Sequence, residues 1–144
     1  MKAKHSFKIA ILAGFFLMAG GRVALAQCDK TATLTASATS YLDAQGTIIK
    51  TVDAGAVISI TKTDLTITPD SDHAMSGKIT SATCDWKVPF KEGKTVVKAV
   101  MSKDGTDEKH VTVTIDGKDG KVALTFEAEE MPGKKIQVVA DKFE

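Results

Sequence analysis

Apolar and polar residues alternate with a period of two along most of this chain, and this period constrains the fold more than any other feature. In residues 31–38, Thr or Ser at the odd positions alternates with Ala or Leu at the even ones. The same alternation recurs in runs at residues 58–60, 65–67, 84–90, 111–115, 122–126 and 136–140. Successive side chains of a β-strand point to opposite faces, so the pattern predicts strands with one buried face. It predicts no amphipathic helix after residue 26.

Short turn sequences separate these runs. They contain Gly or Asp, which tolerate the backbone of tight turns: D-A-Q-G (43–46), V-D-A-G (52–55), T-P-D-S-D (68–72), K-E-G-K (91–94), K-D-G-T-D (103–107), D-G-K-D-G (116–120) and M-P-G-K (131–134). Parallel neighbours would need longer crossover connections. We therefore predict an all-β fold, an antiparallel eight-stranded meander closed into an up-and-down barrel, because closure removes exposed edges. An immunoglobulin-like β-sandwich is the alternative. In that family the hallmark Trp lies between the two cysteines, whereas in this chain Trp86 follows the second cysteine.

The first 26 residues differ in character from the rest of the chain. Lysines at the start precede an apolar run, residues 9–19, and small residues follow at Ala24 and Ala26. This order is typical of a secretory signal peptide cleaved after Ala26, which leaves one domain at residues 27–144. The run is shorter than the about 20 residues that span a bilayer. We expect a periplasmic or extracellular protein with no transmembrane span; lipid anchoring at Cys28 is disfavoured by Gln27 before it.

The charge of the domain argues against nucleic-acid binding. The whole chain has a formal net charge of +1, but residues 1–26 contain four of its 19 cationic residues and no acidic one. The remainder holds 15 Lys and no Arg against 18 acidic residues, a net charge of −3. Phosphate and base recognition relies on clustered cations and favours Arg, so we expect no nucleic-acid partner.

The two cysteines, Cys28 and Cys84, both lie in the predicted exported domain. An even number of cysteines in an oxidising compartment favours pairing, and two cysteines allow one intramolecular disulfide. The alternative is two separate thiols. The sequence has no C-x-x-C, so redox catalysis is not expected.

Several segments together resemble a known family. They are residues 34–42 followed by D-A-Q-G, I-S-I-T-K-T-D-L-T-I-T (58–68), C-D-W-K-V-P-F-K-E-G-K (84–94) and V-T-I-D-G-K-D-G-K-V (113–122). Across nearly the whole predicted domain they look like small secreted lipocalin-like β-barrel proteins of Gram-negative bacteria. The G-x-W that opens many lipocalins is absent here. The resemblance implies a barrel that encloses a small apolar molecule, and it implies no catalytic activity.

Few residues of the chain are candidates for catalysis or metal binding. Asp70, Asp72 and His73 in P-D-S-D-H, with His110, contain metal-ligating groups, but adjacent turn residues rarely converge on one ion and we interpret them as an acidic turn. Asp116 and Asp119 resemble part of a calcium loop but lack its alternating ligands and closing Glu, which favours a hairpin.

The sequence also offers no recognisable catalytic arrangement. Three acidic residues, Glu127, Glu129 and Glu130, lie at the end of a predicted strand, where charges are normally solvated. The chain contains no G-x-S-x-G, H-E-x-x-H or P-loop motif. We expect no enzyme activity, no cofactor and no metal.

Two kinds of partner are consistent with such a domain. The first is a small apolar ligand inside the barrel, with Trp86, Phe126, Tyr41, Val88 and Phe90 as candidate ligand-lining or core residues. In the run at residues 84–90, Trp86, Val88 and Phe90 are predicted to face inward, and Asp85 and Lys87 outward. The second is a periplasmic protein, bound by an interaction or enzyme-inhibitor module on the scale of small domains that inhibit lysozymes. An internal cavity of roughly 300 Å³ or more would favour the ligand, and a filled interior would favour the protein.

Overall fold

The structure is a computed structural model that describes residue 28 and residues 30–70, 73–103 and 105–144. The predicted signal peptide, residues 1–26, lies outside the described residues. The described part is all-β, as predicted, and forms β1 (Ala32–Ala36), β2 (Thr39–Leu42), β3 (Ile48–Val52), β4 (Ala56–Ile60), β5 (Asp64–Pro69), β6 (Met75–Val88), β7 (Glu92–Lys103), β8 (Thr106–Lys118), β9 (Lys121–Ala128), β10 (Lys135–Val139) and β11 (Lys142–Phe143).

All of these strands belong to one antiparallel sheet. Its order is β11-β1-β4-β5-β6-β7-β8-β9-β10-β2-β3. From β4 to β10 each strand pairs with the next along the chain, which confirms the antiparallel meander. A single sheet also differs from the immunoglobulin-like alternative, which needs two.

The sheet differs from an eight-stranded barrel in strand number and in closure. It has eleven strands in the described residues, and β11 and β3 remain as edges that do not pair with each other. Two of the extra strands arise because the first and last long runs each bend: Leu34 of β1 pairs with Phe143 of β11, whereas Thr39 of β2 pairs with Val138 of β10. The sequence pattern reports which residues alternate but contains no clear signal for such bends.

The bend between β1 and β2 changes which positions face inward. Leu34 is buried in the core, and Thr39, five positions later, lines an internal cavity. In a regular strand, residues an odd number of positions apart point to opposite faces. The backbone therefore turns over at Ser37 and Ala38, which separate the two strands.

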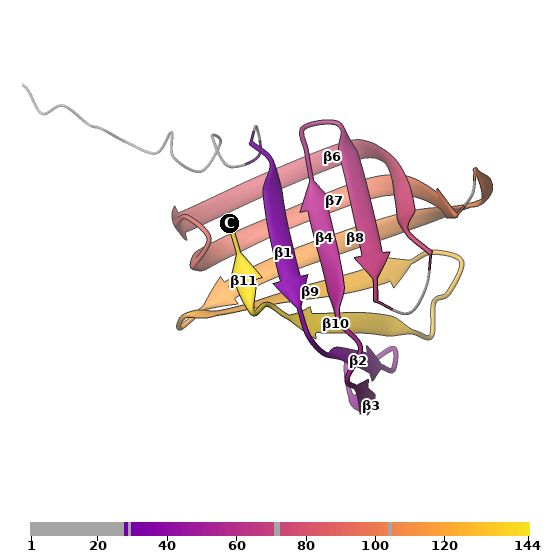
Figure 1. The fold of residues 1–144 in the computed structure, drawn as a ribbon, viewed down its shortest axis with the longest axis horizontal. Coiled ribbons are helices and arrows are strands. Elements are labelled where there is room, and N and C mark those ends of the chain that lie inside the picture. The colour runs from indigo at the N-terminus through magenta and orange to yellow at the C-terminus, as the bar shows by residue number, and fades with distance from the viewer. Residues whose placement is uncertain (1–27, 29, 71–72, 104) are drawn as a thin grey trace, which may run out of the picture.

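The curled sheet folds over itself into two layers. In Figure 1, β1 and β4 cross in front of the long strands β7–β9 at a steep angle, and the β2–β3 hairpin projects from the lower end. Orthogonal packing of this kind places the inward faces of both layers against each other. The largest fully buried side chains lie between them: Leu34, Ile58, Leu65, Met101, Ile115, Val97 and Val113.

Candidate ligand-binding cavity

A cavity of about 430 Å³ lies inside the curled sheet, beside the packed core. This volume falls in the range of small-molecule sites, about 300–1,000 Å³, and exceeds the threshold set above for a ligand carrier. Its lining is mainly apolar and comes from both layers: Thr39, Tyr41, Ala54, Gly55, Ala56, Ile58, Ile67, Pro69, Met75, Lys103, Asp107, Lys109, Leu124, Phe126, Met131, Ile136 and Val138.

Three small residues, Ala54, Gly55 and Ala56, form one wall of the cavity where the chain enters β4. The Thr39 hydroxyl donates a hydrogen bond to the Ala54 carbonyl at 2.6 Å. The Gly55 N–H donates to the Asp70 carboxylate at 2.9 Å, and the Asp70 N–H donates back to the Gly55 carbonyl at 3.0 Å. A Cβ atom on Gly55 would lie 2.3 Å from the Ala36 carbonyl oxygen, so this wall is packed tightly against β1. The space in front of it therefore has a firmly held boundary.

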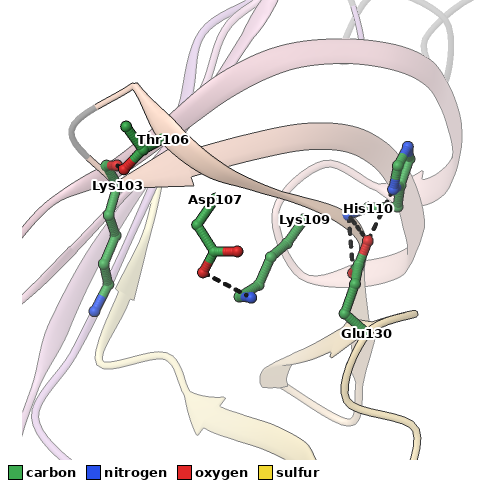
Figure 2. A network of polar contacts seen from close by, with 6 residues as sticks. All are labelled: Lys103, Thr106, Asp107, Lys109, His110 and Glu130. Carbon is green, nitrogen blue, oxygen red and sulfur yellow. Dashed lines mark hydrogen bonds and ion pairs between the residues drawn. The ribbon is translucent and has the colours of Figure 1, made fainter.

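Charged side chains gather at the end of the cavity next to the β7–β8 hairpin. Lys103, Asp107 and Lys109 line the cavity there, and Figure 2 shows all three side chains on the same side of the hairpin ribbon. Lys109 Nζ lies 3.2 Å from Asp107 Oδ2. Lys109 pairs with Met101, which is fully buried, and directly paired residues point to the same face. Lys109 therefore occupies an inward-facing position at the mouth of an apolar space.

Sequence reasoning missed these three residues, although the sequence contains a signal for them. The inward-facing positions of β8 continue from Ile115 and Val113 to Val111, and the next member of that row is Lys109; the exposed Asp107 follows near the hairpin tip. An aliphatic row that becomes charged at one end marks the place where the interior meets water.

Two of the five predicted lining residues reach the cavity. Tyr41 of β2 and Phe126 of β9 both line it. They share its apolar wall with Ile136 of β10, which pairs directly with each of them across neighbouring strands. The prediction for Tyr41 and Phe126 thus agrees with the position of the cavity.

Trp86 faces inward as predicted, but it lies in the packed core away from the cavity. Its indole N–H donates to the Thr95 hydroxyl at 2.7 Å, and its ring lies 5.7 Å from that of Phe143. Trp86, Gly93 and Gly117 are paired in a row across β6, β7 and β8. A Cβ on either glycine would lie 2.8 Å from the indole. The absence of a side chain at both positions therefore leaves the space that the indole ring occupies.

The predicted inward orientation of Val88 is wrong, and Phe90, although half-buried, does not line the cavity. The register between β6 and β7 shifts between Trp86 and Val88, and an extra residue in a strand turns the following side chains to the other face. Val88 is accordingly 43% exposed. Phe90 lies beyond β6 in a turn, with φ of 61°, and its ring packs on Phe143 at a centroid distance of 4.9 Å. Asp85 and Lys87 are exposed, as predicted.

The cysteine prediction is confirmed. Cys28 and Cys84 form a disulfide that joins residues 56 positions apart, with their Cα atoms separated by 5.8 Å. Cys84 lies on β6 beside the Trp86 cluster, where the Thr95 hydroxyl donates to its sulfur at 3.4 Å. The disulfide thus anchors Cys28, which precedes β1, to the packed end of the fold.

His110 and Glu130 form the most strongly perturbed ionisable pair among the described residues. His110 Nδ1 lies 2.9 Å from Glu130 Oε1, and the His110 backbone N–H donates to both carboxylate oxygens (Figure 2). These hydrogen bonds lower the pKa of Glu130 to about 2, and the same side-chain bond raises the pKa of His110 above its ordinary value. His110 alternates with the inward-facing Val111, so the pair lies on the outer face and does not border the cavity.

The acidic turn and the hairpin that were weighed as metal sites have other roles. Asp70 binds the Gly55 backbone, His73 is exposed, and Asp72 lies outside the described residues. Asp119 and Gly120, with φ of 54° and 77°, form a two-residue turn between β8 and β9, which confirms the hairpin interpretation. No three His, Cys, Asp or Glu side chains among the described residues are grouped so that they could hold a metal ion.

Comparisons with protein-family models, with curated proteins and with solved structures find no match to this chain. Within the described residues, no helix is long and apolar enough to cross a membrane.

Proposed function

We propose that this protein is an exported, non-catalytic binding protein that carries a small apolar ligand in its internal cavity. The cavity is the observation that carries the proposal: about 430 Å³ of space is lined by mainly apolar side chains from both layers of the sheet. Leaving such a volume unfilled forfeits packing contacts, which a domain otherwise optimises. A bound apolar molecule would restore those contacts.

Export to the periplasm or the extracellular space is part of the same proposal. The basic and apolar pattern of residues 1–26 supports it, and so does a disulfide, since disulfides persist in oxidising compartments. The perturbed His110–Glu130 pair supports no catalytic role, because it lies on the outer face, on the other side of the sheet from the cavity.

A fluorescence titration with the neutral apolar probe N-phenyl-1-naphthylamine tests this function. We expect saturable binding of one probe per protein. Ile136→Trp, which places a larger side chain into the cavity, should abolish probe binding. Val139→Trp is the matched control, because Val139 lies on the same strand but is exposed, and it should leave binding unchanged. Absence of saturable binding, or equal loss in both variants, would argue against cavity binding.

One observation favours the second candidate, a protein-interaction or enzyme-inhibitor module. The edge strand β3 exposes Ile48 and Ile49, at 56% and 70% of their surfaces. An apolar edge strand offers unpaired backbone groups and side-chain contacts to a partner strand. The test is inhibition of lysozyme activity by the purified protein. Inhibition that rises with protein concentration and disappears in Ile49→Lys would support this role. Absence of inhibition would argue against a lysozyme inhibitor.

A further inference from the structure

We propose that the ligand is a single-chain amphiphile with an anionic head group, whose tail lies in the apolar interior and whose head contacts Lys109 at the hairpin end of the cavity. This inference rests on the proposed function and names its ligand class. It follows from where the charges of the cavity lie and from which of them are already committed to other partners.

The polarity of the cavity is divided between its two ends. Its interior is formed by residues such as Leu124, Phe126 and Ile136, whereas Lys103, Asp107 and Lys109 lie together beside the β7–β8 hairpin. A cavity with an apolar interior and a charged mouth suits an amphiphile, which has an apolar tail and a charged head. A wholly apolar ligand would leave the charged end without a complementary group.

The sign of the charge favours an anionic head. Among the described residues that line the cavity, two are cationic and one is anionic. The anion, Asp107, is 80% exposed at the hairpin tip, whereas the Lys109 side chain is only 25% exposed. An ion pair with so exposed a carboxylate is weak and can be exchanged. Lys109 therefore holds the more enclosed charge, and an anion that enters the cavity can reach it.

Two acidic residues of neighbouring segments, Asp70 and Glu130, have partners of their own. Asp70 accepts a hydrogen bond from the Gly55 backbone, and Glu130 is bound to His110 on the outer face. Lys103 is exposed and engaged in an interaction of its own, whereas Lys109 is half-buried and pairs with the exposed Asp107 carboxylate. The chemistry of the site, with the Lys109 ammonium group at the mouth of an apolar pocket, fits a carboxylate, sulfate or phosphate monoester head.

Displacement of N-phenyl-1-naphthylamine by three ligands that share one alkyl chain tests the inference. The ligands are decanoate, decanol and decyltrimethylammonium, each below the concentration at which it forms micelles. Lys109→Gln should weaken decanoate binding by about tenfold, the size of one charge-assisted hydrogen bond, and should leave decanol binding unchanged. It should not weaken decyltrimethylammonium binding. Added salt should weaken decanoate binding selectively, because it screens the charge.

Lys118→Gln is the matched control, since Lys118 lies on β8 but is exposed at its far end. It should change none of the three affinities, and circular dichroism should confirm that both variants fold. Equal effects of Lys109→Gln on decanoate and decanol, or no effect on either, would overturn the anionic head group while leaving cavity binding intact. Failure of the wild-type protein to bind the probe would instead overturn the proposed function.

Discussion

Substitution of Trp86 tests how the packed end of the fold is held together. Trp86 is 3% exposed and is the only tryptophan of the chain. Trp86→Ala removes the whole ring from a site where the neighbouring Gly93 and Gly117 have no side chain to fill the space. We expect the free energy of unfolding to fall by about 3–5 kcal/mol, as for other buried aromatic residues. That loss is a large part of the 5–15 kcal/mol that stabilises a typical domain.

Trp86→Phe separates ring packing from hydrogen bonding. Phenylalanine keeps much of the ring but leaves the buried Thr95 hydroxyl without the indole donor, at an expected cost of about 1–3 kcal/mol. Adding Thr95→Val removes the hydroxyl as well, together with its hydrogen bond to the Cys84 sulfur. The double variant should then be more stable than the sum of the two single effects predicts, since replacing both partners by apolar groups is far less costly than removing one.

Urea unfolding of the oxidised protein, followed by far-ultraviolet circular dichroism, measures these effects; fluorescence cannot follow unfolding once the only tryptophan is gone. Lys87→Ala, at the exposed next position, should change stability by no more than roughly 0.5 kcal/mol. A loss below about 1 kcal/mol for Trp86→Ala would refute the packing argument, because large-to-small changes at a filled core site cost more than that.

The remaining predictions concern the disulfide, the outer-face ion pair and one glycine. Replacing Cys28 and Cys84 together by Ser should lower the free energy of unfolding by about 4 kcal/mol, from the loop that the disulfide closes, and urea unfolding measures it. Glu130→Gln should lower the pKa of His110, followed by NMR titration of the imidazole. Gly117→Ala should cost about 1–3 kcal/mol in the same unfolding assay, because its Cβ would lie 2.7 Å from the Lys91 carbonyl oxygen.

The His110–Glu130 pair also predicts a pH window for its contribution to stability. His110 has a raised pKa when folded, so its contribution is present below its ordinary value of 6.5 and is lost as the pH rises through the raised value. Glu130 has a lowered pKa, so its contribution is present above 4.5 and is lost as the pH falls towards about 2. The pair should therefore help most between pH 4.5 and 6.5. Glu129→Gln is the control and should shift the His110 pKa less than Glu130→Gln; an equal shift would contradict the hydrogen-bond assignment.

Side-chain alternation and turn residues were sufficient to predict an all-β fold and the antiparallel meander that runs from β4 to β10. The run at residues 111–115 illustrates this: its odd positions are buried and its even positions are not, as the period of two requires. The turn at Asp119 and Gly120 was equally readable, because those residue types favour a positive φ. These features depend on neighbours in the sequence and so leave a local signal.

Features that depend on distant contacts were not readable. The bulge after Trp86 reverses the side to which Val88 points, and nothing in the alternation of residues 84–90 reveals it. The bend at Ser37 likewise depends on pairing with the last strands of the chain. The cavity arises where the two layers separate. Tyr41 and Phe126 were proposed for its lining because they are large aromatic residues, whereas the charged mouth required knowledge of which strand faces point inward.

A heteronuclear NMR titration with decanol tests most directly whether the cavity is a binding site. Cavity binding predicts saturable chemical-shift changes at one-to-one stoichiometry, centred on Tyr41, Phe126 and Ile136, which are neighbours in one apolar wall of the cavity. Ile136→Trp should remove these changes, and Val139→Trp should retain them. Changes centred on the exposed Ile48 and Ile49 of β3, or no saturable change at all, would contradict ligand binding in the cavity.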